Sequence, residues 1–150
     1  MFNSINLTLY TQDDCFYCFE MKRKLSEWGF NFREINISYD LFAKGDMESF
    51  MNMLHEDFTF IYPGDKHPFS GTHNKEGFQK QLMKVPELWS NFQVTAESMI
   101  SEGDKVFVNT KATADGMDTI FGHYLEVKDG KMSKFIAYDD TLSMFNAMKK

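Results

Sequence analysis

Two β-prone runs near the carboxyl end of the chain constrain its fold more than any other feature. The first spans residues 118–127 (DTIFGHYLEV), where Leu125 and Val127 occupy alternating positions, and the second spans 131–138 (KMSKFIAY). Alternation of apolar residues is the pattern of a strand with one buried face. The four residues Lys128–Lys131 join the runs and contain an Asp-Gly pair, which favours a tight turn between strands. The two runs therefore predict a hairpin.

Further strands are expected upstream of this hairpin. Residues 91–100 (NFQVTAESMI) and 105–114 (KVFVNTKATA) alternate apolar and polar positions, and a Ser-Glu-Gly-Asp turn separates them. Residues 55–64 (HEDFTFIYPG) alternate Phe58, Phe60 and Tyr62, which predicts a strand with one aromatic face. The chain thus contains one early strand and a later antiparallel meander of three or four strands.

Helices are expected before and between these strands. The segment 39–54 (YDLFAKGDMESFMNML) predicts two short helices around Gly45, with Asp46 as N-cap of the second. The segment 68–89 (PFSGTHNKEGFQKQLMKVPELW) turns at Ser70-Gly71 and then forms a helix ending near Pro86. A short helix from residue 141 closes the chain.

Composition excludes several classes of protein. The 150 residues suit one domain, or one domain with an appendage. A net charge of −6 without clustered Lys and Arg argues against nucleic-acid binding. No apolar run of about 18 residues is present, so no membrane span is expected, and the amino terminus lacks signal-peptide features, which predicts a cytoplasmic protein. The 16 Phe and 11 Met indicate a well-filled core or, less simply, a hydrophobic pocket.

The first 38 residues differ from the remainder in their pattern of apolar and polar residues, and we expect a boundary between 1–38 and 39–150. The strand NLTLY (6–10), an amphipathic helix from Cys15 to about Trp28, and a second strand at 31–38 predict a β-α-β unit. Helical spacing also continues from Phe32 through Phe42, so residues 31–38 could instead belong to the next helix. A unit of this size is too small to fold alone.

The segment LTLYTQDDCFYC, with MKRKL, Gly29 and FREINI, resembles the opening of glutaredoxins. The resemblance implies half of a thioredoxin-type fold, with Cys15 as nucleophilic thiol at a helix start and Cys18 as resolving thiol. The later cis-Pro loop and Gly-Gly pair of glutaredoxins have no match. Two alternatives follow: the segment is a structural extension docked on the rest, or it is a fusion whose strand pairs with a sheet edge or a partner subunit.

The remainder resembles the nuclear transport factor 2-like superfamily, which includes ketosteroid isomerases and SnoaL-like polyketide cyclases. The resemblance rests on YDLFAKGDMESFMNMLHEDFTF, PFSGTHNKEGF and FGHYLEVKDGKMSKFIAYDDT, in that order. It implies a cone-shaped α+β fold, in which a curved antiparallel sheet packs on helices around an apolar pocket. It also implies a homodimer formed through the outer face of the sheet. It implies no single reaction.

The ketosteroid isomerase residues are not matched. Their base position is occupied by Tyr62, the first-helix Tyr position falls near Ser38, and the position of their protonated Asp holds His123 or Gly122, depending on turn length. We favour His123, which shares a strand face with Leu125. The steroid-isomerase mechanism is therefore not expected.

Candidate catalytic residues in the pocket are His123, Tyr62, Asp139 and Asp140, because a His beside a carboxylate in an apolar cavity can act as a general base. Adjacent strand residues face opposite ways, so only one of the two aspartates enters the pocket and the other caps the helix beginning at Thr141. Phe60, Trp89 and Tyr138 are candidate binding residues.

The function expected from these residues is binding of a small, largely apolar molecule, with acid–base chemistry of the isomerase, cyclase or lyase type as one possibility. A non-catalytic binding or dimerisation module is an alternative, and dithiol redox chemistry through Cys15 and Cys18 is a second. His55, His67 and His73 fit no zinc-site spacing, so neither metal nor cofactor is expected.

Overall fold

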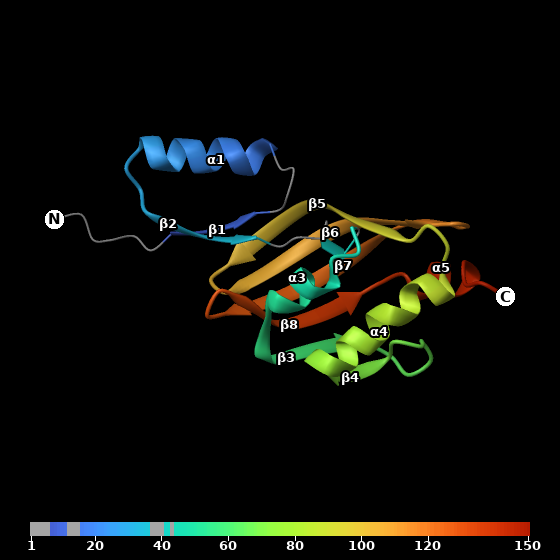
Figure 1. Ribbon diagram of the computed structural model, residues 1–150. Helices are drawn as coiled ribbons and strands as arrows, with labels where there is room; N and C mark the ends of the chain where they lie inside the picture. Colours follow the sequence, from blue (N-terminus) through green and yellow to red (C-terminus); the bar gives the residue numbers. More distant parts are fainter. Residues whose placement is uncertain (1–6, 12–15, 37–40, 43) are drawn as a thin grey trace.

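A computed structural model describes residues 7–11, 16–36, 41–42 and 44–150 (Figure 1). The strands are β1 (Leu7–Thr11), β2 (Phe32–Asn36), β3 (Leu54–Tyr62), β4 (Gly71–Asn74), β5 (Gln93–Glu102), β6 (Lys105–Ala114), β7 (Met117–Lys128) and β8 (Lys131–Tyr138). The helices are α1 (Phe16–Glu27), α3 (Met47–Asn52), α4 (Lys75–Leu88) and α5 (Thr141–Asn146). The predicted order of elements from the early strand to the terminal helix is present, with one addition, strand β4.

The main sheet has six strands in the order β4-β3-β8-β7-β6-β5. Strands β5 to β8 form the predicted antiparallel meander. The prediction of a wholly antiparallel sheet is wrong, because β3 pairs with β8 in parallel, with Phe60 opposite Phe135. An alternating pattern identifies a strand but not its partner, so this pairing was not readable from local sequence. The parallel pair sets the early aromatic strand beside the carboxyl-terminal hairpin.

The turn between β7 and β8 explains how their register is fixed. Asp129 and Gly130 have φ values of 51° and 79°, which are the positive values that a type I′ turn requires at both central positions. Gly adopts such a conformation readily and Asp tolerates it. The turn aligns Lys128 with Lys131, and after a register shift between Glu126 and Val127 the ladder continues with His123 opposite Ala137. The predicted tight turn is confirmed.

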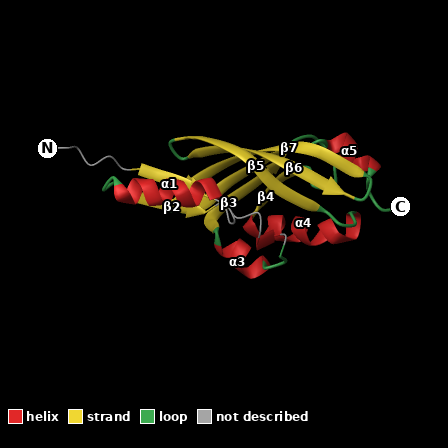
Figure 2. Cartoon of the chain, turned by 90° about the horizontal axis from the view of Figure 1, so that it is seen from above, coloured by secondary structure: helices red, strands yellow, loops and turns green. Residues whose placement is uncertain are grey.

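Helices α3 and α4 lie on one face of the sheet, which curves over them (Figure 2). Asn74 caps the start of helix α4, because its side chain accepts a hydrogen bond from the Gly77 amide, and the helix includes Pro86 in its last turn. The sequence predicted this helix but missed β4, whose four residues turn back from β3 immediately before it. Strand β4 is short and polar, so it carries little apolar periodicity.

The core lies between the helices and the concave face of the sheet. It is dominated by aromatic and Met side chains, as expected from the many Phe and Met residues of the sequence. The buried members are Met51, Leu54, Phe58, Phe60, Tyr62, Phe69, Phe78, Val85, Trp89, Ala112, Met117, Phe121, Ala137 and Met144. These side chains come from α3, α4, α5 and four strands of the main sheet, so the core joins elements far apart in sequence.

The amino-terminal segment forms a β-α-β unit, in which β1 and β2 pair in parallel and α1 connects them (Figure 1). Strand β2 covers Phe32–Asn36, so these residues are not part of the next helix. Strand β1 pairs with β2 and not with an edge of the main sheet. Tyr10 connects the unit to the main domain, because its hydroxyl donates to Gly103 O (2.9 Å). Its ring packs on a small cluster of Ala96, Val106, Val108 and Leu125.

Among the described residues, no helix has the length and apolar character needed to cross a membrane.

Candidate functional site

A cavity of about 100 Å³ lies between α3, α4 and the concave face of the sheet. Most of the side chains around it are apolar: Phe42, Phe50, Met53, Leu54, Phe60, Phe69, Phe78, Leu82, Val85, Phe92, Val94, Phe121, Leu125, Met132, Phe135, Ala137 and Met144. The polar side chains around it are Tyr62, Gln81, His123 and Asp139. Apolar walls with a few polar groups are typical of small-molecule sites.

The rim and the interior of the cavity differ in exposure. Lining side chains from the sheet, such as Phe121 and Leu125, are 1% exposed. Phe50 of α3, Gln81 of α4 and Phe92, which precedes β5, are half-buried, whereas Phe78 and Val85 of α4 are buried. We call the more exposed side, with Phe50, Gln81 and Phe92, the mouth of the cavity, and the side formed by the buried β7 residues Phe121, His123 and Leu125 its inner wall.

His123 and Asp139 form a buried pair at the inner wall. His123 Nε2 lies 3.2 Å from Asp139 Oδ1, and the two side chains are 6% and 9% exposed. The pair exists because His123 lies opposite Ala137 in the β7–β8 ladder, and Asp139 follows two residues later on the same face. The Phe135 ring packs edge-on against the His123 ring at 4.8 Å between centroids. The sequence prediction of His123 as the inward-facing residue agrees with this placement.

Tyr62, at the end of β3, contributes a hydroxyl to the same wall. The hydroxyl donates to Met144 Sδ (3.2 Å). Burial is the main cause that raises the pKa of Tyr62, and the charge of the neighbouring Asp139 carboxylate adds to it. Tyr62 therefore stays protonated at neutral pH, and its phenol acts as a hydrogen-bond donor and not as a base.

Asp140 is not a cavity residue. Its carboxylate accepts hydrogen bonds from the Ser143 amide (3.0 Å), the Ser143 hydroxyl (2.6 Å) and the Thr119 hydroxyl (2.9 Å). These bonds lower its pKa, with the Ser143 hydroxyl as the largest cause. Of the two aspartates that the sequence left open, Asp139 lines the cavity and Asp140 caps α5.

Two of the three predicted binding residues lie elsewhere. Phe60 lines the cavity as expected. Tyr138 is 54% exposed on the outer face of the sheet, because it alternates with Ala137 and Asp139. Trp89 is buried behind the cavity wall, where its indole N–H donates to Met144 O (2.9 Å). The prediction of Tyr138 and Trp89 as pocket walls was wrong because it ignored strand alternation for the first and the packing of α5 for the second.

Two polar features near the cavity were missed from sequence. His67 is 6% exposed, and its ring stacks on Tyr62 at 4.5 Å between centroids. His67 Nδ1 accepts from the Phe69 amide (3.2 Å), and Nε2 has no partner among the described residues. Gln81 comes from α4, where its spacing from Phe78 and Val85 was the available signal. Loop position hid His67, because a loop has no periodicity from which to infer burial.

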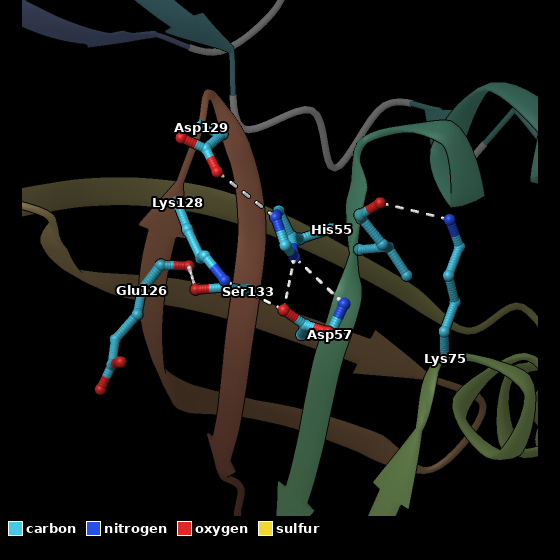
Figure 3. Close-up of polar contacts among 8 residues, drawn as sticks. His55, Asp57, Lys75, Glu126, Lys128, Asp129 and Ser133 are labelled. Carbon is cyan, nitrogen blue, oxygen red and sulfur yellow. Dashed lines mark hydrogen bonds and ion pairs between the residues drawn. The ribbon is translucent and has the colours of Figure 1, made fainter.

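A second polar cluster lies away from the cavity, at the start of β3 (Figure 3). His55 accepts from the Asp57 amide through Nδ1 (3.0 Å), and its Nε2 lies 3.6 Å from Asp129 Oδ2. Lys128 donates to Asp57 Oδ2 (2.9 Å). The cluster fastens the β7–β8 turn to β3, and Figure 3 shows these side chains spanning the two elements. Within the described part of the chain, no group of three or more His, Cys, Asp or Glu side chains has a geometry suited to a metal ion.

The predicted redox pair is described only in part. Cys18 lies near the start of α1, and its sulfur belongs to a disulfide. Cys15 lies outside the described residues. The glutaredoxin resemblance thus stays a prediction.

Residues 37–135 match the SnoaL-like domain family. Comparison with curated proteins finds no significant match. The fold is similar to TerC co-crystallised with polyporic acid, with a TM-score of 0.65 and 23% identity over 73% of this chain and 90% of that one.

Two further structures share the fold. IdmH from Streptomyces antibioticus, described as a candidate polyketide cyclase, has a TM-score of 0.63 and 18% identity over 71% of this chain and 89% of its own. A nuclear transport factor 2-like protein of unknown function from Burkholderia pseudomallei has a TM-score of 0.64 and 20% identity, over 75% and 92%. The family match covers about two thirds of the chain, and the structural matches agree with its fold. The chain belongs to the SnoaL-like domain family, within the nuclear transport factor 2-like fold.

Proposed function

We propose that this protein binds a small, largely apolar molecule in its cavity and performs acid–base chemistry on it with His123 and Asp139. The observation that carries the proposal is the His123–Asp139 pair, 3.2 Å apart at the inner wall of an otherwise apolar cavity. Similarity in fold to IdmH, a candidate polyketide cyclase, supports an isomerase- or cyclase-type reaction.

The proposed chemistry follows from the pairing of His123 Nε2 with Asp139 Oδ1, which lie 3.2 Å apart. In this arrangement Asp139 orients the imidazole, and His123 takes a proton from a carbon beside a carbonyl group. Asp139 then stabilises the imidazolium without accepting the proton itself.

Tyr62 complements this base as a neutral donor. Its phenol stays protonated, since burial and Asp139 raise its pKa. A protonated phenol beside the base can donate to the oxygen that gains negative charge when the carbon loses its proton. The trio of His123, Asp139 and Tyr62 thus supplies a base, a group that orients the base, and a donor.

Proton exchange tests the proposal without knowledge of the natural substrate. We expect the protein to accelerate exchange of the α-protons of β-tetralone, an apolar bicyclic ketone, with deuterated water, followed by NMR. Asp139→Asn and His123→Phe should each slow the exchange by about a hundredfold or more, a typical share for a general base. Asp140→Asn is the matched control and should keep the wild-type rate. Equal rates for wild type and His123→Phe would contradict the proposed chemistry.

We also propose that the protein is a homodimer formed through the outer face of its sheet. A row of apolar and aromatic side chains crosses four adjacent strands there: Ile100, Phe107, Tyr124 and Ile136. Ile120 and Tyr138, 58% and 54% exposed, extend the same face. Gly122 leaves room for the Phe107 ring, since a Cβ at this position would lie 2.7 Å from the ring. A broad apolar face of this kind favours burial against a second copy.

A dithiol function remains a second candidate, supported by the disulfide to which Cys18 belongs near the start of α1. A thiol pKa of Cys15 near the ordinary value of about 8.5 would argue against it. The same measurement on a Cys18→Ser variant gives this value without competition from the second thiol.

A further inference from the structure

Lys84, on α4, is a half-buried cation without a carboxylate partner among the described residues. Of the other half-buried lysines, Lys22, Lys111 and Lys134 each pair with an Asp or Glu, whereas Lys75 donates to the backbone carbonyl of Leu54 (3.2 Å). Partly burying an ammonium group removes water from it, and a facing anion normally offsets that loss. Lys84 instead donates to the neutral amide oxygen of Gln81 (3.1 Å).

The position of this contact relates Lys84 to the cavity. Gln81 lines the cavity together with Phe78, Leu82 and Val85, which form one face of α4. Gln81 is half-buried and belongs to the mouth, whereas the His123–Asp139 pair belongs to the inner wall. The bond from Lys84 occupies the amide oxygen of Gln81 and leaves the amide N–H groups as donors. The mouth therefore presents donors and one positive charge.

We propose that Gln81 and Lys84 bind an anionic group, of the carboxylate or sulfonate class, at the outer end of an otherwise apolar ligand. The ligand supplies the negative charge that Lys84 lacks. A planar anion accepts from the Gln81 amide and the Lys84 ammonium at once, because the two side chains already touch. The apolar side chains that line the rest of the cavity contact the apolar part of the ligand.

This inference rests on the proposed function and narrows its ligand class. The anion lies at the mouth, and the reacting carbonyl lies inside, beside His123 and Asp139. An anion placed at the inner wall would instead face the Asp139 carboxylate and be repelled. The separation of the two polar regions thus fixes the direction in which such a ligand enters, with its charged end outward.

Two fluorescent probes with the same ring system test the anion site. Anilinonaphthalene sulfonate carries a negative charge, and N-phenylnaphthylamine is its neutral counterpart. We expect Lys84→Met to weaken binding of the sulfonate by about five- to tenfold, as for loss of a partly exposed charged hydrogen bond, and to leave the neutral amine unchanged. Lys84→Arg should restore the preference for the sulfonate, and Gln81→Met should weaken the sulfonate selectively.

Lys80→Met is the matched control. Lys80 lies on the same helix, pairs with Glu76 and is exposed, so its removal changes the net charge equally without touching the cavity. It should alter neither affinity. The anion site would be overturned if Lys84→Met and Lys80→Met weakened binding of the sulfonate equally. It would also be overturned if Lys84→Met lost affinity for both probes in parallel.

The neutral probe separates this inference from the proposed function. Leu82→Trp fills the mouth from the same face of α4. If the neutral amine fails to bind the wild type, or binds Leu82→Trp equally well, then the cavity is not a binding site and both proposals fail. If the neutral amine binds only the open cavity, and Lys84→Met leaves the sulfonate affinity unchanged, then the anion site alone is wrong.

Discussion

Asp139 and Asp140 are adjacent in the chain, but their carboxylates have different roles. Asp139 Oδ1 lies 3.2 Å from His123 Nε2 at the cavity wall, whereas Asp140 accepts from Ser143 at the start of α5. The division arises at the end of β8, where the alternation that turns Ala137 inward also turns Asp139 inward. The next residue is left to begin the helix. A single step in sequence therefore separates a proposed catalytic group from a structural one.

Removing the cap should affect stability and not chemistry. Asp140→Ala should lower the free energy of unfolding by about 1 kcal/mol, the usual effect of losing a helix N-cap. Urea denaturation followed by circular dichroism measures this difference.

The pH dependence of the cap has a definite sign. Hydrogen bonds from Ser143 and Thr119 depress the pKa of Asp140 in the folded state. The contribution of Asp140 to the free energy of unfolding is therefore complete above the pKa of about 3.9 that the carboxyl has in the unfolded state. It is lost as the pH falls through the lower pKa of the folded state. The stability gap between wild type and Asp140→Asn should narrow in acid. A gap that is constant from neutral to strongly acidic pH would contradict this account of the cap.

His67 should make the protein less stable in mild acid. Burial lowers the pKa of its imidazole, and the Asp139 charge opposes this only in part. As the pH falls, the His67 side chain therefore takes up a proton in the unfolded state, near a pKa of about 6.5, before it does so in the folded state. The free energy of unfolding is thus highest above that pH and decreases below it. His67→Phe, which keeps an aromatic ring beside Tyr62, should reduce the loss of unfolding free energy between neutral pH and mild acid. His73→Gln serves as a control, and an unchanged acid slope in His67→Phe would contradict the assignment.

Tyr10 should hold the amino-terminal unit on the main domain. Tyr10→Ala removes both the hydroxyl bond to Gly103 and the ring packed on Val106 and its neighbours. We expect faster hydrogen exchange in β1 and unchanged exchange in β3, because the main core does not include Tyr10. Tyr10→Phe keeps the ring and should show a smaller effect. Equal protection of β1 in all three proteins would show that other contacts hold the unit.

The outer face of the sheet should determine the oligomeric state. Ile120→Lys places a charge within the proposed dimer interface, where burial without a partner is unfavourable. Analytical ultracentrifugation should show a dimer for the wild type and a monomer for this variant. Met83→Lys introduces the same charge at an apolar residue of α4 that is 62% exposed, and it should remain dimeric. A wild-type monomer at high concentration would refute the interface.

Local patterns predicted most elements but not their long-range pairing. The Asp-Gly turn, the meander and the β-α-β order were readable because each depends on neighbouring residues. The parallel contact between β3 and β8 was not readable, since its partners are more than seventy residues apart and neither strand encodes its neighbour.

The candidate site, like the fold, was predictable from the sequence only where local patterns determine it. Alternation from Leu125 identified His123 as an inward residue, and the choice between Asp139 and Asp140 required the structure. His67 and Lys84 became visible only through burial, because a loop histidine and a helical lysine resemble ordinary surface residues in sequence.

The most direct test of the central claim is NMR of the four histidine rings during ligand titration. Histidine labelled at its ring nitrogens, with His123 assigned from the His123→Phe variant, reports the cavity and the distant surface in one spectrum. On addition of β-tetralone we expect the His123 nitrogens to shift, while His55, at the start of β3 and away from the cavity, does not change. An unperturbed His123 at saturating ligand, or equal shifts at His123 and His55, would contradict a ligand site at the His123–Asp139 pair.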